Sequence, residues 1–152
     1  MPTPDALAPV AGDHRRRELA EALTVQAARL VRLARRTHSR SAGIRVLSIL
    51  DETGPLGIGA LAQADRCSQP TMTGQVKDLA EQGFVAKQPH PDDARSTLVV
   101  LTEAGLAELA RVRSLNADLV TERLARHPEL DTDDLARAVA VLRAVVDPSD
   151  LP

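Results

Sequence analysis

The hydrophobic pattern of this 152-residue chain changes its period once and then changes back. Up to Gly83, apolar residues recur every three or four positions, as they do along one face of an amphipathic helix. Residues 84–88 and 97–101 are short β-branched or apolar segments that predict two strands, and the helical period resumes after them. We therefore predict a mostly α (α+β) fold with one small antiparallel hairpin.

Proline, glycine and capping residues divide the chain into segments. Residues 1–13 hold three prolines and no periodic apolar pattern, which predicts a flexible arm. Ser41, Ser68 and Thr102 are candidate helix N-caps, and Gly54 is a candidate helix stop. The predicted organisation is an arm at 1–13, a long helix at 14–40, a central lobe at 41–101 and C-terminal helices at 102–147.

Two short helices, predicted near 58–65 and 68–83, precede the hairpin and complete a winged helix-turn-helix pattern. Met72, Val76 and Leu79 lie at i, i+4 and i+7 and predict the buried face of the second helix. Its other faces carry groups that can hydrogen-bond base edges or phosphates in a major groove. These residues are Gln69, Pro70, Thr71, Thr73, Gly74, Gln75 and Lys77.

Several segments of this region resemble the MarR (multiple antibiotic resistance regulator) family: Leu61-Ala62, 68–79, Gly83-Phe84-Val85, Asp93-Ala94-Arg95 and 101–105. The resemblance implies that the second helix enters the major groove and that Arg95, held by Asp93, enters the minor groove. It also places the start of the helix that begins at Ser41, with Arg40 and Arg45, near phosphates. The residues expected to contact DNA are Arg40, Arg45, Ser68, Gln69, Pro70, Thr71, Thr73, Gln75, Lys77, Asp93 and Arg95.

Some of these residues admit a plainer interpretation. Asp93 and Arg95 could simply pair across a solvated turn. Gln69 and Gly74 stand where the family often has basic residues, so Lys77 is the only cation of this helix. Gly74 indicates either a close approach to DNA or to another helix, or a locally weakened helix.

The charge distribution is the main argument against DNA binding. The formal net charge is −2, whereas DNA-binding domains are usually basic. Residues 1–50 nevertheless carry nine basic and four acidic side chains, so a dimer could bind through local basic edges. The run from Arg15 to Arg17 could steer DNA or form a solvated helix face. The competing hypothesis is a winged-helix module that binds protein without specific DNA binding.

The sequence offers little support for an enzyme or a metal protein. It has no glycine-rich phosphate loop, paired histidine and carboxylate, or nucleophile elbow, so we assign no catalytic residue and no cofactor. The four histidines are scattered, and no metal site is predicted. Cys67, the single cysteine, is expected to pack between the two short helices, the alternative being a redox sensor. No apolar stretch approaches a membrane span, and we expect a cytoplasmic protein.

Apolar stripes in the C-terminal third of the chain predict self-association. The stripes from Leu106 to Leu119 and from Leu135 to Val146 need a partner that one small lobe cannot supply, so we expect a homodimer. Two recognition helices related by a two-fold axis would read a pseudo-palindromic double-stranded operator with half-sites roughly 34 Å apart. The resemblance implies a transcriptional repressor released by a small aromatic or phenolic effector.

Overall fold

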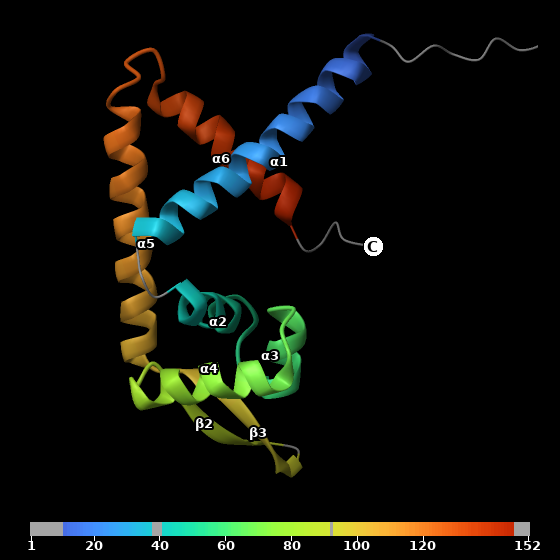
Figure 1. Ribbon diagram of the computed structural model, residues 1–152, viewed down its shortest axis with the longest axis vertical. Coiled ribbons are helices and arrows are strands. Elements are labelled where there is room, and N and C mark those ends of the chain that lie inside the picture. Colours follow the sequence, from blue (N-terminus) through green and yellow to red (C-terminus); the bar gives the residue numbers. More distant parts are fainter. Residues whose placement is uncertain (1–10, 38–40, 92, 148–152) are drawn as a thin grey trace, which may run out of the picture. The chain divides into compact units, whose positions relative to one another are not determined.

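The computed structural model describes residues 11–37, 41–91 and 93–147, with the backbone alone at 11, 37, 41, 42 and 93–95. The chain divides into two compact units, residues 1–110 and 111–152. In chain order the elements are α1 (Ala11–Thr37), α2 (Ser41–Thr53), β1 (Leu56–Gly57), α3 (Ile58–Ala64), α4 (Gln69–Glu81), β2 (Val85–His90), β3 (Asp93–Leu101), α5 (Glu103–Leu124) and α6 (Thr132–Val146) (Figure 1). The predicted mostly α fold with a small antiparallel sheet is confirmed.

The sheet has three strands in the order β1-β3-β2, and both pairings are antiparallel. Val85 pairs with Leu101 at the base of the wing, and Leu56 pairs with Val99 on the other side of β3. From Gly54 to Gly57 the sequence predicts only a tight connector, where the structure has β1. Two residues are too few to display a strand period, and β1 exists because β3 offers it a free edge.

The wing is longer than expected. The sequence predicts strands that end at Gln88 and begin again at Thr97, with a long polar tip between them, but pairing continues to the His90–Asp93 pair, so the long tip is a wrong prediction. The register shifts between Pro89 and His90, which is typical of a bulge. Proline cannot donate a ladder hydrogen bond, so strand pairing continues there only through an irregular step.

A single apolar core holds α2, α3, α4 and the sheet together. It confirms the predicted buried stripe of α4, because Met72 and Val76 are fully buried and Leu79 is 4% exposed. The remaining fully buried side chains of the lobe come from the other elements: Val46, Leu47, Leu61, Val99 and, from the start of α5, Leu109 at 2%. α4 contacts both α2 and β2, and Figure 1 shows it lying between α2 and the hairpin.

The end of α4, the base of the wing and the start of α5 meet in one junction. Gly83 turns the chain with a φ of +76°, a conformation that favours glycine. The hydroxyl of Thr102 donates to the Gly83 carbonyl at 2.6 Å and accepts from the Gly105 N–H at 3.0 Å, which confirms the predicted cap. A Cβ on Gly105 would overlap the Phe84 carbonyl oxygen, so this position has room only for glycine.

The outer helices bury little in a single chain. α1 begins at Ala11, so residues 11–13 belong to this helix and not to the expected arm. No residue of α6 is buried, and Leu135, Val139 and Val146 are between 41% and 68% exposed. The last helix begins at Thr132, where the sequence Thr132-Asp133-Asp134 predicts a helix start, and its N-cap Asp131 forms a reciprocal capping box with Asp134.

None of the helices within 11–37, 41–91 and 93–147 has both the length and the apolarity needed to cross a bilayer. Over the same residues, no three or more His, Cys, Asp and Glu side chains are grouped so that they could hold a metal ion.

Candidate nucleic-acid interface

The N-terminus of α4 is fixed by local hydrogen bonds. Ser68 has extended backbone angles, and its side-chain oxygen accepts from the Thr71 N–H at 3.3 Å. The two hydroxyls of Ser68 and Thr71 also lie 2.8 Å apart, and Pro70 occupies the first turn, where its missing N–H costs nothing. Sequence analysis predicted this start correctly, because serine followed by proline is a strong helix-start signal.

The outward side of α4 presents mostly short polar side chains. Gln69, Pro70, Thr71, Thr73 and Lys77 are all exposed. The Thr73 hydroxyl donates to the Gln69 carbonyl at 2.8 Å, which leaves its oxygen available as an acceptor. This surface suits hydrogen bonding to base edges and phosphates, as the sequence led us to expect.

The side chain of Gln69 lies against a glycine of the neighbouring helix, α3. Its Nε2 lies 2.9 Å from the position that a Cβ on Gly59 would occupy. The glycine at this position of α3 therefore lets the amide of Gln69 lie against the helix. The sequence gives no indication of this contact, because Gly59 is only a glycine in a short helix until the two helices are docked.

Gln75 differs from the other polar residues of α4. It is half-buried, and its Oε1 is buried without a hydrogen-bond partner among the described residues. A buried amide oxygen without a partner is costly, so this side chain is not simply displayed to solvent. Its position between the buried stripe and the outer face explains why periodicity alone placed it outside.

Gly74 is exposed, and no heavy atom lies within 4 Å of the position that its Cβ would take. Close packing against another helix of this chain therefore does not explain the glycine. The two remaining interpretations are a close approach to DNA and a weakened helix.

Arg45 projects from α2 toward the turn that follows α3. Its Nη2 lies 2.7 Å from Oδ2 of Asp65, whose side chain is only 4% exposed. This hydrogen bond raises the pKa of the Arg45 guanidinium above its usual value. Sequence analysis assigned Arg45 to phosphate contact and did not foresee its partner, which lies 20 residues away in the chain. Arg40, assigned with it, lies outside the described residues.

Lys77, on α4, is less constrained than Arg45. Lys77 lies 3.9 Å from Glu81 one turn later, and both side chains are well exposed, so this ion pair contributes little. In the wing, Asp93 and Arg95 lie in β3, where the description covers the backbone alone. His90 ends β2 opposite Asp93.

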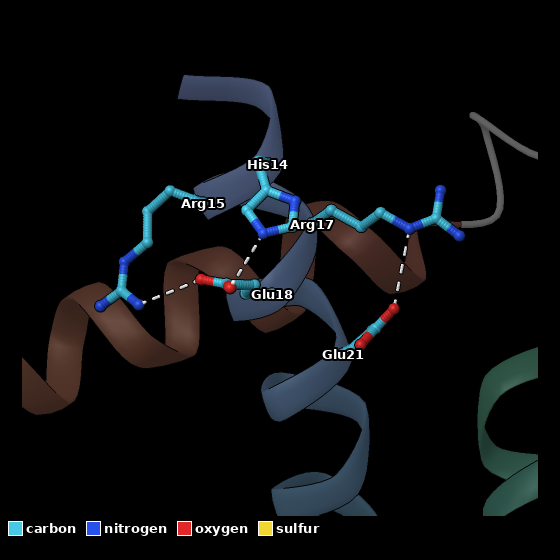
Figure 2. Close-up of polar contacts among 5 residues, drawn as sticks. All are labelled: His14, Arg15, Arg17, Glu18 and Glu21. Carbon is cyan, nitrogen blue, oxygen red and sulfur yellow. Dashed lines mark hydrogen bonds and ion pairs between the residues drawn. The ribbon is translucent and has the colours of Figure 1, made fainter. Parts of the chain in front are cut away.

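The arginine run at the start of α1 is largely engaged within its own helix. Figure 2 shows Arg15 and His14 paired with Glu18, at 3.4 Å and 3.2 Å, and Arg17 paired with Glu21 at 3.7 Å. All of these side chains are at least half exposed. These i,i+3 and i,i+4 pairs favour the solvated-face interpretation of the run.

Cys67 lies in the turn before α4 and is half-buried, packed against the apolar core. Its Sγ donates to the Ser68 carbonyl at 3.6 Å. This environment is that of a small packing side chain, the first of the two interpretations given by the sequence.

Comparison with known proteins agrees with this architecture. The model of the MarR family matches residues 41–97, the segment that forms the lobe from α2 into β3. An uncharacterized HTH-type transcriptional regulator of Mycobacterium bovis is 35% identical over 106 residues, covering 70% of this chain and 74% of that protein. The HTH-type transcriptional repressor IacR of Pseudomonas putida is 31% identical over 98 residues, covering 64% of this chain and 59% of that protein.

Solved structures show the same fold at lower identity. The apo form of MarR from E. coli superposes with a TM-score of 0.63 at 20% identity, covering 93% of this chain and 99% of that one. The match therefore extends beyond the lobe to nearly the whole chain. Taken with the 35% identical relative, these similarities show that this chain belongs to the MarR family.

Proposed function

We propose that this protein is a homodimeric, sequence-specific DNA-binding regulator of transcription that acts as a repressor. The observation that carries the proposal is α4: a helix anchored on one face by Met72 and Val76, capped at its start, and polar along its exposed side. A rigid helix that displays hydroxyls and amides beside an antiparallel wing has the form of a recognition helix.

The proposed DNA contacts divide by their chemistry. Gln69, Thr71 and Thr73 offer hydrogen-bonding groups to base edges in the major groove, and Ser68 at the helix start offers one to a phosphate. Arg95 on the wing would enter the minor groove, where a narrow A·T-rich segment attracts a guanidinium. The other residues assigned to this surface are Arg40, Arg45, Pro70, Gln75, Lys77 and Asp93.

Dimerisation follows from apolar surface that a single chain leaves uncovered. α6 buries none of its residues, although Leu135, Val139 and Val146 lie along one face of it. In α1, Leu19, Val25 and Leu30 are between 44% and 54% exposed. Pairing of these helices with a second copy would remove this surface from water and set two copies of α4 on a pseudo-palindromic operator.

Release by a small ligand is the regulatory part of the proposal. A compound that favours one spacing of the two lobes over another shifts the dimer toward or away from the form that fits DNA. The relative IacR carries the name of a repressor, which supports this direction of control. An aromatic or phenolic effector would find few stacking partners, because Phe84 is the only aromatic residue of the chain.

The test is selection of DNA from a fragment library of the source genome by the purified full-length protein, with Arg95→Ala and Arg137→Ala compared in parallel. Arg137 is an exposed cation on α6 and controls for the loss of one positive charge. We expect a two-fold symmetric motif with half-sites one helical turn apart, weakened by Arg95→Ala and unchanged by Arg137→Ala.

The competing function, a winged-helix module that binds protein, has one observation in its favour. Arg45 and Lys77, two of the basic residues assigned to this surface, both have acidic partners in the structure. Retention of DNA without any motif, or no retention at physiological salt, would overturn the specific regulator and leave the protein-binding module as the leading hypothesis.

A further inference from the structure

The turn between α3 and α4 contains a residue in an unusual backbone conformation. Arg66 has a φ of +53° and is the only non-glycine residue with positive φ in the described part of the chain. This left-handed conformation is easy for glycine and costs most other residues free energy. An arginine here is therefore not explained by the requirements of the turn.

Packing does not explain Arg66 either. The residue is exposed, and its backbone N–H donates to the Gln63 carbonyl at 3.2 Å, a contact that any residue except proline could make. Within 11–37, 41–91 and 93–147 its guanidinium has no ion-pair partner. The adjacent carboxylate, Asp65, points into the protein and is occupied by Arg45.

The surrounding sequence makes this single charge important. Between Arg45 and Lys77, Arg66 is the only lysine or arginine. Arg45 is held by the buried Asp65 and Lys77 lies 3.9 Å from Glu81, so Arg66 is the one of these three cations without an acidic partner among the described residues. It precedes the N-cap Ser68 by two residues, so its Cα lies within about 7.6 Å of that residue and close to the exposed side of α4.

We infer that Arg66 binds a backbone phosphate of the DNA duplex at the edge of the groove that α4 enters, supplying a cationic contact at the start of that helix. This inference rests on the proposed function. A guanidinium offers paired N–H donors that match two phosphate oxygens, and the phosphate contact would hold the start of α4 in register without reading sequence.

The test compares Arg66→Lys with Arg66→Gln in the full-length protein. Both side chains are unbranched at Cβ, so they have a similar cost for the positive φ at this position, and they differ in charge. The measured quantity is the slope of log affinity against log salt concentration, on mixed-sequence duplex DNA and on the selected operator. Each phosphate contact adds about 0.9 to the magnitude of the salt slope. A dimer loses two such contacts in Arg66→Gln, so the magnitude of its slope should fall by about 1.8. Its affinity near physiological salt should fall about 10- to 30-fold.

The lysine variant should keep the salt slope, and the control Arg137→Gln, which removes an exposed cation from α6, should keep both slope and affinity. Arg66→Gly should unfold at the same temperature as the unmodified protein or above it while binding DNA as weakly as Arg66→Gln. This combination separates a phosphate contact from a structural role, because a structural arginine would lower the unfolding temperature when replaced.

Two outcomes would overturn the inference. If Arg66→Gln bound DNA with the slope of the unmodified protein, the phosphate contact would be wrong although the proposed function stood. If Arg66→Gly lowered the unfolding temperature clearly, Arg66 would serve the fold. Failure of the unmodified protein to bind either DNA at low salt would instead refute the proposed function, and Arg66 with it.

Discussion

The side chain of Asp65 is only 4% exposed, and its Oδ2 accepts a 2.7 Å hydrogen bond from Nη2 of Arg45. The pair joins α2 to the turn that leads into α4, between residues 20 positions apart. Since a buried carboxylate without a partner is costly, this bond helps to set the position of the turn.

Replacing Arg45 should therefore destabilise the protein. We expect Arg45→Met to lower the free energy of unfolding by about 2 kcal/mol, because Asp65 remains buried and loses its partner. Urea titration followed by circular dichroism would measure the change. Asp65→Asn should lower the free energy of unfolding by less than Arg45→Met does. The double variant should lose less free energy than the two single variants lose together. Strictly additive losses would contradict the pairing, because they would show that the two side chains act independently.

Gly105 should not tolerate a side chain. A Cβ there would overlap the carbonyl oxygen of Phe84, so Gly105→Ala must displace the start of α5 from the base of the wing. We expect a loss of about 2–3 kcal/mol in the free energy of unfolding, the range of an overpacked core. Gly12→Ala in α1, where nothing lies within 4 Å, is the control and should change stability little or raise it. Equal unfolding midpoints for the two variants would contradict the predicted clash.

Gly74→Ala distinguishes the two explanations of that glycine. Because the position is exposed and unobstructed within α4, alanine should raise the free energy of unfolding by about 1 kcal/mol. If the backbone at Gly74 must approach DNA closely, the same variant should bind the operator more weakly in a fluorescence anisotropy titration. Unchanged binding with higher stability would leave a weakened helix as the explanation.

An acidic residue on the apolar face of α6 should prevent association. We expect Val139→Glu to shift the protein from dimer to monomer at micromolar concentration in analytical ultracentrifugation, because it places a charge on surface proposed to be covered by the second copy. Arg137→Gln changes the net charge by the same amount on the opposite face of the helix and should leave the dimer intact. A dimeric Val139→Glu protein would refute the role of this face.

The sequence predicted the parts of the fold that depend on local rules. The cap at Ser68, the cap at Thr102 and the buried stripe through Met72 and Val76 each follow from residue types within one or two helical turns. The DNA-contact residues proposed from the sequence stay predictions, although most of those on α4 do lie on its exposed side.

What the sequence could not predict depends on contacts between distant residues. The burial of Asp65 requires the partner on α2, and the strand β1 requires the edge of β3. The half-buried position of Gln75 becomes visible only when α4 has docked on its neighbours. Arg66 was overlooked because an arginine in a polar turn looks ordinary until its backbone angle is known.

The attachment of α5 to the lobe also limits where this protein can bend. The hydroxyl of Thr102 bridges Gly83 and Gly105, and the Phe84 carbonyl accepts the Thr102 N–H at 3.1 Å. The first turn of α5 therefore cannot rotate as a hinge without breaking these contacts. Under the proposed release by a ligand, a change in the spacing of two lobes would therefore have to leave the first turn of α5 attached to its own lobe.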